Sequence, residues 1–235
     1  MNVRGSKAFV TGANRGIGRE LVKALLDAGA AKVYAAARDV ASFGDTNGMD
    51  MSKVVHVELD ITNPQQIERA ANDAHDVDLL INNAAVLEFD EATAVSARVA
   101  RLHFDVNVWG AFEMTRVFTR AGGPTELQAV ATILSLIALR NAPAMAAYSA
   151  SKAAAWSFTR SFRESLRPRG IAVHAVFPGA VDTDMLASVR MPKADPRAVA
   201  QAIVAEIQAG REDIYPDSQS MQWVNRPGIP GGHSV

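Results

Sequence analysis

Short apolar segments alternate along the chain with longer segments in which apolar residues recur every three or four positions. A short apolar run between turn residues is typical of a buried strand, and the longer period is typical of an amphipathic helix. The pattern predicts strands at residues 7–11, 32–37, 54–59, 78–81, 129–135 and 171–177, with a short seventh strand at 214–215. It predicts helices over residues 15–28, 95–120 and 148–167, one opening at 63–64, and a last one from 195 to about 210.

Repeated alternation of strand and helix predicts a parallel sheet covered by helices on both faces. A length of 235 residues suits one α/β domain of this kind. We therefore expect residues 1–235 to form a single doubly wound α/β domain around a seven-stranded parallel sheet. Residues 217–235 are rich in proline and glycine and carry no strong pattern, so the structure of this tail stays unassigned.

Composition narrows the classes of function. The net charge is −1 and the basic residues are spread along the chain, which argues against a nucleic-acid or membrane-surface partner. The absence of cysteine excludes disulfides and thiol catalysis, and the five histidines occur singly, so we expect no metal site. The first residues lack an apolar signal region, and the longest mostly apolar run, 129–139, is too short to cross a bilayer. A cytoplasmic enzyme is the expectation.

A glycine-rich turn, residues 11–18 (TGANRGIG), lies between the first expected strand and the first expected helix. At such a turn Gly12 permits the change of direction, and Gly16 lets the backbone approach a pyrophosphate. Gly18 allows the helix to pack closely on the strand, while the helix N-terminus favours an anion. The alternative is a tight structural turn, but the position favours dinucleotide binding.

The end of the second expected strand indicates which dinucleotide. Sites for NAD usually carry an acidic residue there, which holds the ribose 2′-hydroxyl. This chain has Arg38 instead, and Arg15 can approach from the glycine turn. Guanidinium groups suit phosphate because they donate in a planar fork, so we expect NADP(H). The alternative is that Arg38 pairs with the neighbouring Asp39 at the surface.

Tyr148 and Lys152 stand four residues apart, so on a helix both side chains lie on one face. A cation about 5 Å from a phenol, at an effective dielectric of about 20, contributes roughly 3 kcal/mol, or about two pKa units. We therefore expect Lys152 to lower the pKa of Tyr148 so that the phenol exchanges a proton with a substrate oxygen. Ser135, thirteen residues earlier, can return on a loop beside the phenol; the alternative is that it only satisfies local backbone groups.

Taken in order, these segments resemble the short-chain dehydrogenase/reductase family over about residues 6–185. The residues that carry the resemblance are Thr11–Gly18, Asp60, Asn82-Asn83-Ala84-Ala85, Asn107, Ser135, Tyr148 with Lys152, and Pro178-Gly179. The family commonly has glycine where this chain has Ala85. The resemblance implies a Rossmann-type sheet in the order 3-2-1-4-5-6-7, with NADP(H) across its carboxyl edge.

The resemblance also assigns residues to the cofactor. Those implied to contact it are Gly12, Asn14, Arg15, Gly16, Ile17, Gly18, Arg38, Asp60, Ile61, Asn83, Ala84, Ala85, Tyr148, Lys152, Pro178, Gly179, Val181 and Thr183. Asp60 would accept from the adenine amino group with Ile61 beside it, and Asn83 and Ala84 would pass close to the adenosine ribose. The residues from Pro178 onward would hold the nicotinamide end.

For catalysis, the resemblance implies that Tyr148 donates the proton in carbonyl reduction and that Lys152 also contacts the nicotinamide ribose. Ser135 would hydrogen-bond the substrate oxygen. Asn107 would lie at a local break in the long helix, where a water connects it to Lys152; the alternative is an exposed helical asparagine.

Apolar residues follow Ser135 and Gly179, and in this family such segments line the substrate pocket. The residues expected there are Leu136, Ile137, Met145, Met185 and Leu186. An apolar ketone or aldehyde is therefore favoured over a sugar or a charged acid, although the same residues could simply pack the core. Surplus large apolar residues on the helices of Asn107 and Tyr148 predict a homodimer or homotetramer: Trp109, Phe112, Phe118, Trp156, Phe158 and Phe162.

The sequence thus predicts an NADPH-dependent oxidoreductase that reduces a ketone or aldehyde to an alcohol. Two alternatives stay open. One is an alcohol dehydrogenase that works oxidatively with the same groups, and the other is a protein that senses NADP(H) without catalysis.

Overall fold

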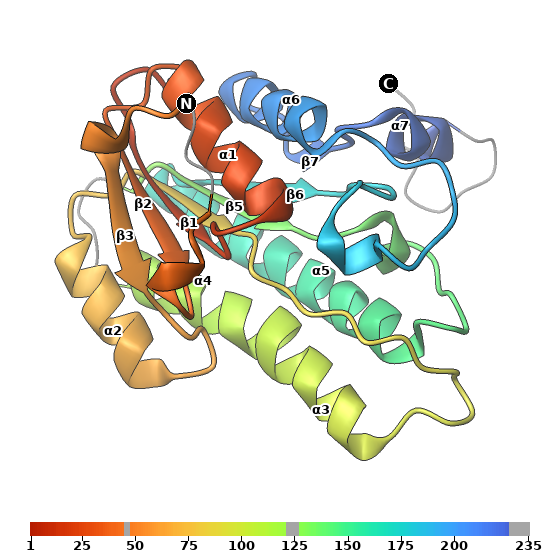
Figure 1. The fold of residues 1–235 in the computed structure, drawn as a ribbon. Coiled ribbons are helices and arrows are strands. Elements are labelled where there is room, and N and C mark those ends of the chain that lie inside the picture. The colour runs from red at the N-terminus through yellow and green to blue at the C-terminus, as the bar shows by residue number, and fades with distance from the viewer. Residues whose placement is uncertain (45–47, 121–126, 226–235) are drawn as a thin grey trace.

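The computed structural model describes residues 1–44, 48–120 and 127–225. Seven strands form one parallel sheet in the order β3-β2-β1-β4-β5-β6-β7 (Figure 1). Their bounds are β1 Lys7–Thr11, β2 Lys32–Ala37, β3 Val54–Glu58, β4 Leu79–Asn82, β5 Ala129–Ile133, β6 Ala172–Val176 and β7 Asp213–Ile214. The predicted fold class and strand order are confirmed.

The helices of the described residues are α1 Gly16–Asp27, α2 Pro64–Asp73, α3 Ala97–Phe104, α4 Ala111–Thr119, α5 Ala146–Leu166, α6 Pro196–Gln208 and α7 Ser218–Val224. The helix predicted over residues 95–120 is divided, because a π-helical segment, Asp105–Gly110, separates α3 from α4. The prediction that the helix starting at Asp195-Pro196 is the last one was wrong, since α7 follows it in the unassigned tail. The rest of that tail, residues 226–235, lies outside the described residues.

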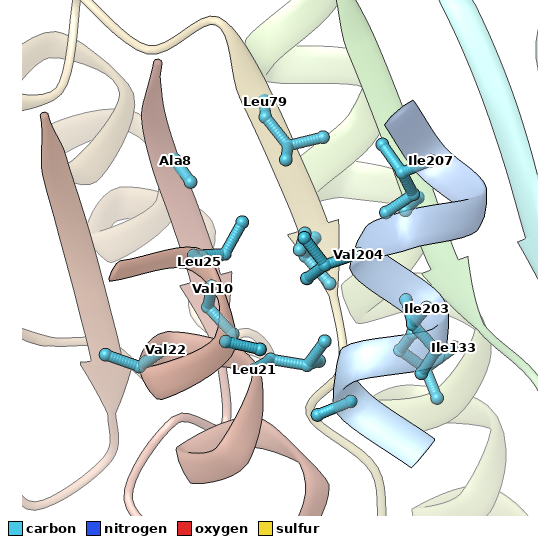
Figure 2. Packing of buried hydrophobic residues seen from close by; sticks show 14 of the residues in the cluster. Ala8, Val10, Leu21, Val22, Leu25, Leu79, Ile133, Ile203, Val204 and Ile207 are labelled. Carbon is cyan, nitrogen blue, oxygen red and sulfur yellow. The ribbon is translucent and has the colours of Figure 1, made fainter. Parts of the chain in front are cut away.

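The helices form a layer on each face of the sheet. In Figure 1, α1 and α6 cover one face, and α2, α4 and α5 cover the other. Successive strand residues point to opposite faces, so Val10 packs in the α1/α6 core and Phe9 in the core of α2 and α4. Figure 2 shows the first core, in which Leu21 of α1 and Ile203 of α6 meet the sheet.

Local chemistry sets where helices begin. The Asn63 side chain accepts hydrogen bonds from the amides of residues 65 and 66, and Pro64 occupies the first turn of α2. The Asp195 carboxylate accepts from the amide of Arg197 and caps α6 in the same way. An oxygen-bearing cap followed by proline is a strong start signal, which is why both starts could be predicted.

The central strand β1 pairs with β2 on one side and with β4 on the other. From β1 to β3 the chain adds strands on one side of β1, and from β4 onward it adds them on the other side. Ligands of open α/β sheets bind at the carboxyl ends of the strands beside such a reversal of strand order. Among the helices of the described residues, none has the length and apolarity needed to cross a membrane.

Candidate active site

A cavity of about 1130 Å³ opens at the carboxyl edge of the sheet. Its wall includes residues that follow β1, β2, β3, β4, β5 and β6. All the predicted cofactor-contact and substrate-pocket residues line it, as does Ser135, whereas Asn107 does not. Pockets for drug-sized ligands are about 300–1,000 Å³, so this cavity has room for a larger ligand or for two ligands together.

The glycine turn has the close backbone approach that its sequence predicts. Gly12 and Gly16 have φ of 62° and 54°, in the left-handed region that favours glycine. A Cβ atom on Gly18 would lie 2.1 Å from the Gly12 carbonyl oxygen, so no side chain fits there. The turn is thus shaped by glycine at the three positions that the dinucleotide interpretation requires.

Hydrogen bonds join this turn to the end of β4. The Thr11 hydroxyl accepts from the backbone amides of Asn83 and Ala84, both at 3.0 Å. In return, the Asn83 side-chain amide donates to the carbonyls of Thr11 and Gly12 at 2.9 and 3.0 Å. Asn83 therefore lines the cavity while its side chain holds the glycine turn in place.

The first turn of α1 suits an anion. It contains no acidic residue, and within the described chain no side chain caps it, so no side chain competes with an anion for its first amides. Arg15 precedes the helix and forms an exposed ion pair with Asp184, 3.6 Å away, across the mouth of the cavity. These groups fit the pyrophosphate of a dinucleotide.

Arg38 follows β2, is exposed and lines the cavity. The Asp39 carboxylate accepts from the amide of Ala41 at 2.9 Å and caps a short 3-10 turn, Val40–Ser42. Over the described ranges the Arg38 guanidinium has no ion pair and no hydrogen bond, so the surface pairing of Arg38 with Asp39 is not found. This cation is available to a ligand phosphate.

Asp60 follows β3 and also lines the cavity. Its Oδ1 accepts from the amide and the hydroxyl of Thr62 at 2.9 and 2.8 Å, while its own amide donates to Gln66 at 2.6 Å. These bonds fix the orientation of the carboxylate and leave Oδ2 able to accept from a ligand. Ile61 beside it is buried against Gly110.

Tyr148 and Lys152 lie on one face of α5, as predicted, with the Lys152 Nζ atom 5.7 Å from the centre of the phenol ring. The ammonium donates to the Ile133 carbonyl at the end of β5, at 2.9 Å. Ser135, two residues further, hydrogen-bonds the Tyr148 phenol and also accepts from the amide of Ile137 at 3.3 Å. Ser135 therefore bonds a local backbone amide, as one interpretation predicts, and also contacts the Tyr148 phenol, as the other predicts.

The prediction that Lys152 lowers the pKa of Tyr148 is wrong, because the pKa of the buried phenol is raised. Burial raises the pKa of Tyr148 to about 12, against the opposing effect of the Ser135 hydrogen bond. Burial also lowers the pKa of Lys152 to about 8. Only 8% of Tyr148 and 3% of Lys152 is exposed, so desolvation of the charged form is the largest cause of the pKa shift of each group.

Asn107 lies in the π-helical segment, which is the predicted break in the helix, and only 2% of it is exposed. Its Oδ1 accepts from the amide of Val86 at 2.8 Å, and its Nδ2 donates to the Val86 carbonyl and the Ser151 hydroxyl at 3.0 and 3.1 Å. The alternative of an exposed asparagine is therefore excluded. The water link to Lys152 stays a prediction.

Helix α7 forms part of the site that sequence reasoning missed. The Gly179 amide donates to Asp217 at 2.8 Å, and the Ala180 amide donates to Gln219 at 3.1 Å. Gln219 also donates to the Pro192 carbonyl at 2.8 Å, so it joins both ends of the short segment that covers the cavity. A signal was present, because Asp217 and the serine three residues later form a capping box.

The substrate end of the cavity is mostly apolar. Leu136 and Ile137 are buried, and Leu136 also packs in a core cluster with Phe177, so pocket lining and core packing coexist. Sequence reasoning missed further lining residues: Val86, Leu87, Phe89, Leu102, Arg140 and Val189. Arg140 lies over the Trp223 ring of α7, 4.9 Å from its centre, and adds one cation to this wall.

The described residues contain no group of three or more histidine, aspartate or glutamate side chains placed to hold a metal ion. The polar side chains that line the cavity carry hydroxyl, amide, ammonium, guanidinium and carboxylate groups.

Comparisons with known proteins agree on one family. Residues 6–194 match the family model described as short chain dehydrogenase. Carbonyl reductase (NADPH) 2 of Sus scrofa is 34% identical over 80% of this chain and 77% of its own. The 3-oxoacyl-acyl-carrier-protein reductase of Salmonella typhimurium is 29% identical over 90% of this chain and 85% of its own.

Solved structures have the same fold. A short-chain dehydrogenase from Burkholderia cenocepacia, in complex with NADP, superposes with a TM-score of 0.87, at 37% identity, over 95% of this chain and 92% of its own. Another from Burkholderia phymatum, in complex with NAD, has a TM-score of 0.81 at 23% identity over all of both chains.

Proposed function

The chain belongs to the short-chain dehydrogenase/reductase family of oxidoreductases, and from that membership we propose that it reduces a ketone or aldehyde to an alcohol with NADPH. One observation carries the proposal. Ser135, Tyr148 and Lys152 line the same cavity as the glycine turn and the start of α1.

The choice of NADP(H) rests on charge. Arg38 is a cation without a carboxylate partner in the described residues, at the position where an acidic residue would hold the ribose hydroxyl of NAD. The similar Burkholderia cenocepacia protein is described in complex with NADP, whereas a more distant one holds NAD. Asp60 would hold the adenine, and the α1 N-terminus the pyrophosphate.

The protein's groups divide the chemistry among them. When bound, the nicotinamide supplies or accepts the hydride and, in its oxidised form, adds a positive charge to the site. Tyr148 gives its phenol proton to the developing alkoxide, and Ser135 donates a hydrogen bond to the same oxygen. Burial raises the pKa of Tyr148 to about 12, so the phenol carries at neutral pH the proton that it gives to the alkoxide.

We propose an apolar carbonyl compound as substrate, because Leu136, Ile137 and Met145 line the same cavity as Tyr148. The curated relatives differ in the compounds their names imply, one a carbonyl reductase and one a 3-oxoacyl reductase. A panel of apolar ketones, aldehydes, a 3-oxoacyl thioester, sugars and keto acids tests this choice. A clear preference for sugars or keto acids would count against an apolar pocket.

A homodimer or homotetramer is also proposed. Trp109 is 49% exposed and contacts the rings of Phe112 and Phe158 at centroid distances of 6.0 and 5.7 Å. Phe118, by contrast, is buried in the core, so only part of the predicted aromatic set is available to a partner. A monomer in light scattering at micromolar concentration would refute this assembly.

The test of the proposed function is NADPH consumption across the carbonyl panel, followed by the reverse reaction with the product alcohol. Turnover in the reductive direction at neutral pH supports the proposal. Tight NADPH binding without turnover of any carbonyl or alcohol would favour the sensing alternative, and turnover only of alcohols would favour the oxidative one. The cytoplasmic location and the single domain over residues 1–235 stay predictions.

A further inference from the structure

We infer that His103 is a positioning residue for this reaction. It holds the cavity wall formed by residues 83–90 and packs against the ring of Tyr148. The inference rests on the proposed function, because its readout is carbonyl turnover.

The wall segment needs such support. Residues 83–89 follow β4 without regular secondary structure, and Val86, Leu87 and Phe89 line the cavity. The start of the segment is held by the Thr11 hydroxyl, which accepts from the amides of Asn83 and Ala84, and at its far end the Asp90 amide donates to the Ala144 carbonyl at 3.2 Å. Side chains must therefore hold the backbone between these points.

Two side chains one helical turn apart do so. Asn107 bonds both backbone groups of Val86, and His103 accepts at Nε2 from the amide of Glu88 at 3.1 Å. A spacing of four places both side chains on one helix face. Alternate residues of the wall are thus anchored to the same face of α3 and its π-helical continuation.

The contacts of His103 define which of its ring nitrogens donates and which accepts. Its Nδ1 lies 2.9 Å from the Val99 carbonyl, and the ring is fully buried, at 0% exposure. A carbonyl oxygen only accepts and an amide only donates, so Nδ1 carries the proton and Nε2 is the acceptor. An apolar side chain at this position would leave the Glu88 amide without its acceptor.

The same imidazole meets the proton donor. Its ring centre lies 6.0 Å from that of Tyr148 at an interplanar angle of 69°, an edge-to-face contact. Ser151 also links Asn107, which holds the wall segment, to Tyr148 on α5. Its hydroxyl accepts from Asn107 and donates to the Tyr148 carbonyl at 2.7 Å. A shift of the wall relative to Tyr148 would misplace the substrate carbonyl.

Two substitutions of His103 distinguish the effect of its hydrogen-bond acceptor from the effect of its aromatic ring. His103→Phe keeps an aromatic ring and removes the acceptor, and we expect kcat/KM for the carbonyl to fall about 10-fold, chiefly through KM, with the NADPH Kd within about 2-fold. His103→Gln restores an acceptor at similar reach, and we expect kcat/KM within about 3-fold of the unmodified protein.

A second buried histidine offers the matched control. His174 in β6 is 1% exposed, lies outside the cavity wall and bonds the Arg211 carbonyl. His174→Phe disturbs the core in a comparable way, so it should lower the melting temperature without changing kcat/KM per folded molecule. Melting temperatures measured for all three variants give the folded fraction at the assay temperature.

Wild-type kcat/KM in His103→Phe would overturn the inference, as would a well-folded His103→Gln as impaired as His103→Phe. Should His103→Phe not fold, amide hydrogen exchange in the unmodified protein decides. A protected Glu88 amide supports the anchor, and exchange as fast as in an exposed loop overturns it. Absence of NADPH-dependent turnover in the unmodified protein would instead contradict the proposed function.

Discussion

Replacing Lys152 with methionine tests the claim that burial dominates the electrostatics of the site. The ammonium is 3% exposed, and its hydrogen bond is to the Ile133 carbonyl. Burial lowers the pKa of Lys152 from 10.5 to about 8. We expect the variant to lose turnover and yet to unfold less easily at neutral pH, in the absence of cofactor.

The magnitude follows from the pKa. A drop from 10.5 to about 8 corresponds to about 3 kcal/mol of destabilisation while both states are protonated. Methionine has a similar volume and no charge, but it leaves the Ile133 carbonyl without its donor, which costs about 1 kcal/mol. The variant should therefore gain about 2 kcal/mol in unfolding free energy at neutral pH.

The gain must depend on pH. The folded pKa lies below the unfolded one, so between about 8 and 10.5 the unfolded chain holds a proton that the folded protein has released. Stability of the unmodified protein therefore rises with pH across this window, and the advantage of the variant disappears. The pKa of Tyr148, raised from 10.0 to about 12, affects stability in both proteins above about pH 10 and cancels in the difference.

Urea unfolding followed by tryptophan fluorescence measures this difference, at one protein concentration because of the proposed assembly. Lys53→Met is the matched control, since Lys53 is 43% exposed and, among the residues that the structure describes, pairs only with the exposed Asp50. It should change stability by less than about 0.5 kcal/mol at either pH. A Lys152→Met protein less stable than the unmodified one at neutral pH, or a gain unchanged at alkaline pH, would refute the reasoning.

Three further substitutions test the cofactor end of the cavity. Arg38→Leu should lower kcat/KM with NADPH about 10- to 100-fold and leave the value with NADH within about 2-fold, because only the former carries the phosphate; equal losses would contradict the assignment. Gly18→Ala should abolish NADPH binding measured by fluorescence, since its Cβ would lie 2.1 Å from the Gly12 carbonyl oxygen; unaltered affinity would contradict the close approach. Gln219→Ala should lower kcat about 5-fold with little change in melting temperature, because two hydrogen bonds that hold the cover of the cavity are lost; an unchanged kcat would show that α7 does not shape the site.

Much of the fold could be predicted because local chemistry and the global pattern agree. The strand bounds Lys7–Thr11 and Lys32–Ala37 follow directly from apolar runs between turn residues. The residues of the cavity wall could be placed because the carboxyl ends of parallel strands meet at one edge. Arg38 and Asp60 reach the same cavity for that reason alone.

What the sequence did not reveal depends on tertiary contacts. The pKa direction of Tyr148 was mispredicted because the calculation used the charge of Lys152 and not the burial of both groups. Helix α7 was missed because seven residues carry too little periodicity, and only its Asp217 cap marked it. His103 gave no signal at all, since nothing in the spacing of a single histidine indicates a bond to the amide of Glu88.

The most direct measurement is steady-state NADPH oxidation by the unmodified protein and by Tyr148→Phe, with the best ketone of the panel and NADPH at saturation. Loss of the proton donor should lower kcat about 100- to 10,000-fold while the NADPH Kd changes less than about 2-fold. A Tyr148→Phe protein that keeps more than about a tenth of the original kcat would contradict proton donation by Tyr148, because general acid catalysis contributes more than that.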